Sequence, residues 1–90
     1  MTKGKRAPRG VVAHQEPAVR YAAEEAVKTA GYDVVGAAEG QQALQLLIDQ
    51  PSADALVVDV ALPGKAGYEL CDEILQRGLP TKVVFVASVY

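Results

Sequence analysis

Short runs of apolar, largely β-branched residues alternate along this chain with segments whose apolar residues recur every three or four positions. This alternation constrains the fold more than any other feature, because each run predicts a strand and each amphipathic segment predicts a helix. Strands that are joined by helices form a parallel sheet, since the helix carries the chain back to the end where the previous strand began. The sequence therefore predicts an α/β fold, a parallel sheet with helices on both faces.

The pattern continues from residue 10 to the end of the chain. Apolar runs predict strands at 10–13, 32–38, 55–58 and 83–87, and helical spacing predicts helices over 17–30, 43–48 and 68–75. Pro17 suits the first turn of a helix, where its missing N–H costs nothing. Gly31 and Gly78 follow the first and third helical segments and predict their ends.

Polar residues follow two of the predicted strands. His14, Gln15 and Glu16 come directly after the first run, and Asp59 comes directly after the third. In sheets of this kind, ligands bind beyond the carboxyl ends of the strands, at the point where the strand order reverses. We therefore expect the functional residues at this edge of the sheet.

The formal net charge of −2 is unevenly distributed. Residues 1–10 hold four basic residues, interrupted by Gly and Pro, and no acidic one. This predicts a flexible, solvated basic arm, followed by one domain over residues 11–90. The remaining chain is acidic, so nucleic acid is not expected as a partner of this domain.

Cysteine content and hydropathy limit the disulfides that the chain can form and the location expected for it. Cys71 is the single cysteine, which excludes an internal disulfide, and its helical spacing with Tyr68 and Leu75 predicts a small buried side chain. The longest apolar run is far shorter than a membrane span, and no secretory apolar region follows the basic start. We therefore expect a cytoplasmic protein.

The position of Asp59 leaves three chemical roles open. An aspartate at the end of a buried strand serves as a nucleophile, as a metal ligand, or as an acceptor that braces a loop. Position alone does not choose among them. For His14, a hydrogen-bonded structural role is favoured over a metal ligand or proton shuttle, because a lone imidazole after a buried strand is usually structural.

The segment from Leu56 to Cys71 closely resembles the phosphoacceptor segment of bacterial response-regulator receiver domains. In that family an Asp ends the third strand, a Pro follows four residues on, and a Gly four residues later opens the third helix. Here these residues are Asp59, Pro63 and Gly67. The resemblance extends over residues 11–90, including the starts of the first two helices and the turn into the second strand.

The resemblance implies a flavodoxin-like sheet with the order 2-1-3-4 for the strands present here, and with the last strand and helix of the receiver fold missing. It implies that Asp59 accepts a phosphoryl group from a histidine kinase in a two-component phosphorelay. It also implies a bound Mg²⁺, with the Ala61 backbone carbonyl as a further ligand. The family is a signalling family, so we do not expect an enzyme.

The sequence departs from the family at the end of the first strand, where an acidic pair is usual. His14 and Gln15 occupy those positions, so the predicted Mg²⁺ site of Asp59, Gln15 and Ala61 is degenerate. Mg²⁺ prefers hard oxygen ligands, and imidazole is a poor substitute. Glu16 is acidic, but one position along the chain its side chain would normally point elsewhere.

A second departure lies after the fourth run. The family places a Thr or Ser there, and the matching residue is Ala87, with Ser88 one residue beyond. A shift of one residue turns a side chain to the other face of the strand unless a bulge intervenes. The family's Lys at the end of strand five has no counterpart in the ninety residues.

Three function classes follow from these residues. The first is a phosphoacceptor receiver domain, and the second is a pseudo-receiver, which uses the same fold as a phosphorylation-independent protein-interaction module. The third, a small flavodoxin-like enzyme, is disfavoured because no Gly-rich phosphate loop follows the first run. The expected partners are a histidine kinase or another signalling protein, and a second copy of the chain paired through strand four, whose exposed edge invites pairing.

Overall fold

Four strands and three helices alternate along the part of the chain that the structure describes, as predicted. The computed structural model describes residues 7–49, 53–60, 62 and 67–86. The strands are β1 (Arg9–Ala13), β2 (Asp33–Ala37), β3 (Ala55–Asp59) and β4 (Lys82–Val86), and the helices are α1 (Pro17–Thr29), α2 (Gly40–Asp49) and α3 (Gly67–Arg77). All strand pairs are parallel, and the order β2-β1-β3-β4 confirms the predicted order.

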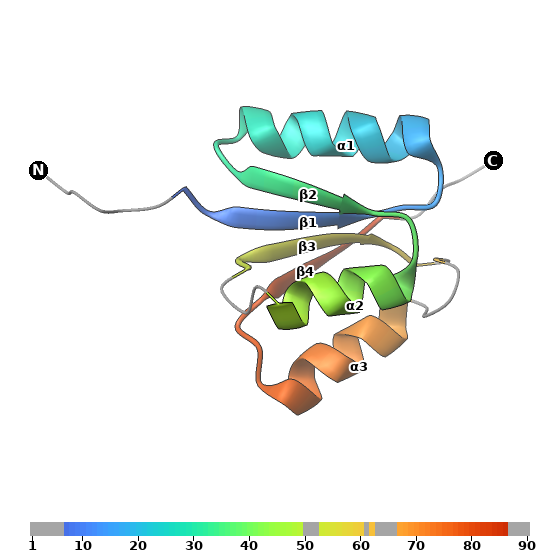
Figure 1. Ribbon diagram of the computed structural model, residues 1–90, viewed down its shortest axis with the longest axis vertical. Helices are drawn as coiled ribbons and strands as arrows, with labels where there is room; N and C mark the ends of the chain where they lie inside the picture. The colour runs from blue at the N-terminus through green and yellow to red at the C-terminus, as the bar shows by residue number, and fades with distance from the viewer. Residues whose placement is uncertain (1–6, 50–52, 61, 63–66, 87–90) are drawn as a thin grey trace, which may run out of the picture.

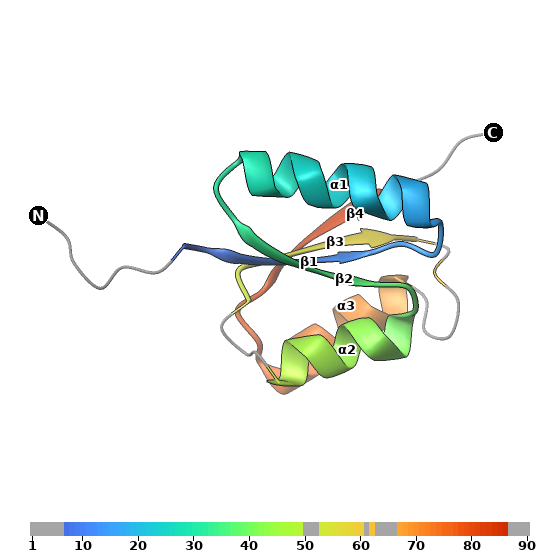
Figure 2. The ribbon, with the colours of Figure 1, turned by 45° about the horizontal axis from the view of Figure 1, so that its top comes forward.

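The helices lie on both faces of the sheet. Figures 1 and 2 show α1 on one face and α2 together with α3 on the other. A β-strand followed by a helix and a parallel β-strand almost always makes a right-handed crossover, so the position where the order reverses decides which face each helix covers. The predicted flavodoxin-like fold is thus confirmed.

The apolar core lies between the sheet and the α2–α3 layer. Leu47 of α2, Leu56 of β3 and Leu70 of α3 are fully buried, and alternate residues of β1 and β3 complete the cluster. Burying one such side chain contributes about 1.5–3 kcal/mol. These contacts hold the carboxyl ends of β1 and β3 in place.

The opposite face is covered less completely. α1 packs on β1 and β2 and contains no fully buried residue. Val84 is the register partner of Val57, which pairs with Val12, and by alternation these three residues face the α1 side. Val84 is 52% exposed, so this face of β4 has little cover among the described residues.

The boundaries of some elements differ from the predicted ones. β1 begins at Arg9, inside the predicted arm, because the Arg9 amide donates to Asp54 Oδ2 at 2.9 Å and its carbonyl accepts the Asp54 amide. Cys71 is half-buried rather than buried, since it lies on the flank of α3. Gly31 and Gly78 have φ of +100° and +66°, the left-handed conformation expected where a helix ends.

The described helices contain 13, 10 and 11 residues, which is shorter than a membrane span. None of them is long and apolar enough to cross a membrane.

Candidate functional site

His14 and Asp59 meet at the carboxyl edge of the sheet. His14 directly follows β1 and Asp59 ends the adjacent β3, so the parallel pairing of these strands brings the two side chains together. The His14 Nε2 atom lies 3.4 Å from Asp59 Oδ2. The residues are 4% and 5% exposed, and with Thr81 they are the buried polar residues of the described chain.

The backbone sets the protonation pattern of the imidazole ring. The Glu16 amide donates to His14 Nδ1 at 3.1 Å. A ring nitrogen that accepts a hydrogen bond carries no proton, so the hydrogen-bond pattern assigns the proton of the neutral ring to Nε2. The Nε2–H group is therefore the one that faces the Asp59 carboxylate.

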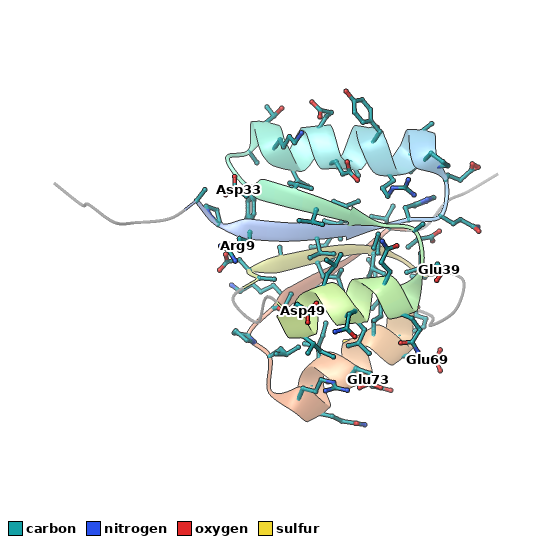
Figure 3. The ribbon with its side chains drawn as sticks, in the orientation of Figure 1. Arg9, Asp33, Glu39, Asp49, Glu69 and Glu73 are labelled. Atoms are coloured by element: carbon teal, nitrogen blue, oxygen red, sulfur yellow. The ribbon has the colours of Figure 1, made fainter. Side chains whose placement is uncertain are left out.

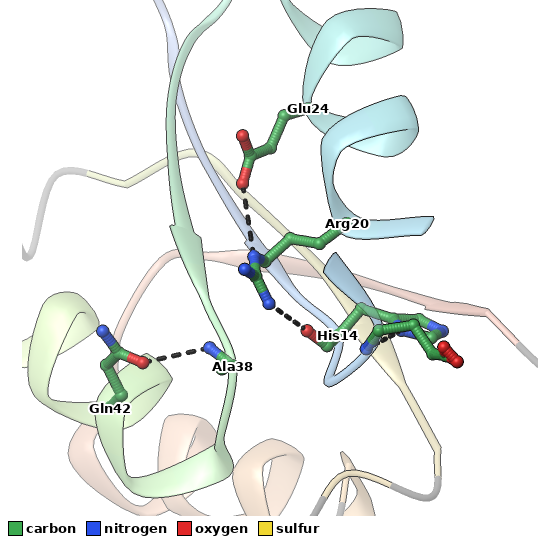
Figure 4. A network of polar contacts seen from close by, with 6 residues as sticks. His14, Arg20, Glu24, Ala38 and Gln42 are labelled. Carbon is green, nitrogen blue, oxygen red and sulfur yellow. Dashed lines mark hydrogen bonds and ion pairs between the residues drawn. The ribbon is translucent and has the colours of Figure 1, made fainter. Parts of the chain in front are cut away.

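Arg20 of α1 holds the turn in which His14 lies. Its Nη1 donates to the His14 carbonyl at 2.9 Å, and its Nε lies 3.8 Å from Glu24 Oε2 (Figure 4). The His14 amide donates to the Ala37 carbonyl of β2 at 3.0 Å. Both backbone groups of His14 are thus fixed, one by a helix and one by a strand.

Sequence reasoning did not identify Arg20, because its position indicated only the polar side of the first helix. One residue of the sequence does indicate the position of Arg20, and it is Gly36 of β2. A side chain there would overlap the Glu24 carboxylate and crowd Arg20, so the strand leaves room for this ion pair. A glycine inside an apolar strand is a general indication that another group approaches closely.

The entry to α2 lies beside this network. The Gln42 side chain, in the first turn of α2, accepts the Ala38 amide at 3.0 Å (Figure 4). A side chain that reaches back from the third helical position satisfies an amide that the helix itself leaves unpaired. This contact fixes the loop after β2 at the same edge of the sheet.

The start of α3 packs closely against Asp59. A Cβ atom on Gly67 would lie 3.1 Å from the Asp59 carbonyl oxygen and 3.2 Å from Phe85 Cε1. The Phe85 ring in turn packs on Tyr68, with 5.1 Å between ring centroids. Gly67 therefore allows the start of α3 to lie directly against the end of β3.

Exposed carboxylates surround the buried pair. Figure 3 shows Glu39 and Glu69 at the end of the molecule where the strands finish, and both residues are exposed. Glu16, at the N-cap of α1, is exposed as well. The described part of this rim therefore carries an excess of negative charge, which attracts cationic groups and repels anions.

The remaining predicted site residues lie in two places. Gln15 is exposed, whereas His14 and Asp59 are buried, and the Glu16 backbone amide donates to His14. Ala61, Pro63, Ala87 and Ser88 lie outside the described residues, so their predicted roles stay predictions.

The donor set at Asp59 does not fit Mg²⁺. The ion requires near-octahedral oxygen ligands, and an imidazole directs an N–H group at the one buried carboxylate. Among the residues that the structure describes, no group of three His, Cys, Asp or Glu side chains could hold a metal ion. The arrangement supports a close electrostatic contact between an imidazole nitrogen and a carboxylate oxygen within a buried polar pair.

Comparison with known proteins identifies the family. The family model described as the response regulator receiver domain matches residues 11–89. A cyclic di-GMP phosphodiesterase of Thermotoga maritima is 31% identical over 80 residues, covering 89% of this chain and 21% of that protein. The transcriptional regulatory protein AfsQ1 of Streptomyces coelicolor is 37% identical over 67 residues, covering 74% of this chain and 29% of that protein.

Solved structures agree with this match. The signal receiver domain of NarL from Mycobacterium tuberculosis superimposes with a TM-score of 0.85 at 26% identity, covering 96% of this chain and 70% of that chain. A response regulator receiver domain protein from Clostridium thermocellum has the same fold, with a TM-score of 0.82 at 17% identity and coverages of 89% and 64%.

The chain spans less than a third of the length of the curated relatives it matches, so the activities of those whole proteins do not transfer to it. The family match over residues 11–89 includes His14, Asp59 and the strands that they follow or end. The chain belongs to the response regulator receiver domain family of two-component signalling.

Proposed function

We propose that this receiver domain is a pseudo-receiver, a protein-interaction module whose conformation does not depend on phosphoryl transfer to Asp59. The observation that carries the proposal is the buried contact between His14 Nε2 and Asp59 Oδ2. It places a ring nitrogen of the protein itself beside the carboxylate. A histidine kinase or another signalling protein is the proposed partner, and the cytoplasm is the proposed location.

The chemistry of phosphoryl transfer supports this choice. A carboxylate that attacks an anionic phosphoryl group meets like-charge repulsion, which a divalent cation and fixed donors normally offset. A neutral Nε2–H group beside the carboxylate carries a bond dipole but no net charge, so it offsets this repulsion less than a divalent cation would. The exposed carboxylates of Glu16, Glu39 and Glu69 add to the repulsion of an anionic donor.

The test is incubation of the protein with Mg²⁺ and a small phosphodonor such as acetyl phosphate, followed by intact mass measurement. We expect no Asp59-dependent mass increase, with Asp59→Asn as the control that removes the acceptor. A phosphoryl adduct on the natural chain that is lost in Asp59→Asn would overturn the proposal.

One observation favours the second candidate, a phosphoacceptor receiver domain in a phosphorelay. Asp59 ends β3 at the carboxyl edge of the sheet, with Gly67 closely packed behind it, which matches the family's segment. In that case the Ala61 carbonyl and Ser88 would assist Asp59. The same mass measurement separates the two candidates.

We further propose that the edge of β4 is the surface through which a second copy binds. Among the described strands, β4 pairs with β3 alone, and Val84 and Phe85 are exposed. An antiparallel pairing of two β4 strands centred on Val84 sets Lys82 of each copy opposite Val86 of the other. Like charges then do not face each other, which favours self-pairing of this edge.

A further inference from the structure

We infer that His14 takes the place of the divalent cation at Asp59, and that the Glu16 amide locks the imidazole ring in the Nε2–H form that this role requires. The inference deepens the proposed pseudo-receiver function and rests on it. It assigns a specificity-determining role to residue 14, because this residue decides whether the Asp59 carboxylate faces an imidazole or binds a metal ion.

The first step of the argument is the geometry of the pair. Nε2 and Oδ2 lie 3.4 Å apart, and both residues are at least nine-tenths buried. A Mg²⁺ ion binds carboxylate oxygen at about 2.1 Å and keeps several waters. An ion on the His14 side of the carboxylate would therefore meet the Nε2–H group, which repels it.

The second step concerns the ring tautomer. For the ring to bind a metal through Nε2, its proton must move to Nδ1. There it would point at the Glu16 amide, whose nitrogen lies 3.1 Å away, so two donors would face each other. The hydrogen bond that positions the ring thus also prevents the ring from acting as a ligand.

The third step concerns the rigidity of the turn. The backbone of His14, from which the ring projects toward the Glu16 amide, is held in place because Arg20 binds the His14 carbonyl and Ala37 binds its amide. Arg20 is itself held near Glu24 over the surface of β2. Arg20 is therefore a positioning residue for His14.

The experiment uses the full chain labelled with ¹⁵N and long-range ¹H–¹⁵N correlation spectra of the imidazole ring. His14 is the single histidine, so one set of ring signals reports the tautomer without ambiguity. We expect a protonated Nε2 and an unprotonated Nδ1, and no saturable shift of either signal when MgCl₂ is added. A ring protonated at Nδ1, or a saturable Mg²⁺ shift in the natural chain, would overturn the inference.

A variant tests the assignment in the opposite direction. His14→Asp replaces the donor with a second carboxylate, and we expect saturable, Mg²⁺-dependent amide shifts near residue 59 that vanish in His14→Asp combined with Asp59→Asn. Gln15→Asp, which adds the same charge at the neighbouring exposed position, should not produce them. If His14→Asp folds and still ignores Mg²⁺, residue 14 does not decide metal binding and the inference is wrong.

Two further results distinguish a failure of the inference about His14 from a failure of the pseudo-receiver proposal. If His14→Asp does not fold, the tautomer and MgCl₂ measurements on the natural chain still decide the inference. If acetyl phosphate modifies Asp59 of the natural chain equally with and without Mg²⁺, the pseudo-receiver proposal fails while the role of His14 stands. A modification that requires Mg²⁺ contradicts both.

Discussion

At the scale of single residues, the buried pair of His14 and Asp59 is the feature that distinguishes this domain. A buried carboxylate is costly unless polar groups lie close to it, and the imidazole places Nε2 3.4 Å from its Oδ2 within the fold. The pair therefore has a structural consequence as well as a functional one. It links the ends of β1 and β3.

Substitution of His14 should destabilise the domain. In His14→Ala the buried Asp59 carboxylate loses its polar contact with Nε2, and we expect the free energy of unfolding to fall by about 1–3 kcal/mol. Urea denaturation of the variant and of the natural chain measures this difference in the free energy of unfolding. His14→Gln, which can present an amide donor, should recover part of the loss, and Gln15→Ala should change stability by less than about 0.5 kcal/mol. Equal stability of His14→Ala and the natural chain would contradict this expectation.

Gly67 offers a second prediction at this scale. In Gly67→Ala the new methyl group would press against the Asp59 carbonyl oxygen and the Phe85 ring. We expect a loss of about 1–3 kcal/mol, since tightly packed sites do not accept an added carbon without movement. Gln76→Ala, an exposed change within the same helix, is the matched control in thermal melts, and a similar melting temperature for both variants would count against close packing at Gly67.

At the scale of elements, the two faces of the sheet differ in how much they bury. The α2–α3 face contains the fully buried leucines, whereas α1 has no fully buried residue. The reason is coverage, because α1 lies over β1 and β2 and leaves the α1 side of β4 exposed. Stability is therefore expected to depend more on α3 than on α1.

A pair of truncations tests this difference. Leu70→Ala removes a side chain that is fully buried in the core, and we expect a loss of about 2–5 kcal/mol. Val19→Ala in α1, where Val19 is 41% exposed, should cost less than about 1 kcal/mol. The comparison is made by urea denaturation, and equal losses would show that α1 carries as much burial as α3.

At the scale of the whole molecule, the exposed edge of β4 governs association. Two copies that pair through this edge would form one continuous sheet, with Val84 at the centre of the contact. Sedimentation velocity should then show a concentration-dependent dimer. Natural sheets avoid such pairing by placing lysine on exposed edges, so Val84→Lys should shift the protein to monomer.

The control for this experiment is Val19→Lys, which places the same charge on the exposed part of α1 and should leave the dimer intact. A natural chain that sediments as a monomer at every concentration would show that the edge does not pair. Loss of the dimer in both variants would indicate an effect of charge rather than of the edge.

The sequence by itself determined the order of the elements, the parallel sheet and the edge at which His14 and Asp59 lie, because apolar periodicity and the positions of Pro and Gly are local signals. It did not reveal Arg20, the extension of β1 to Arg9, or the half-buried state of Cys71. Only the tertiary structure decided that the Glu16 amide meets Nδ1 and that Nε2 faces Asp59. Such contacts depend on the angle at which the chain leaves each strand, and this angle is set by packing between segments far apart in sequence.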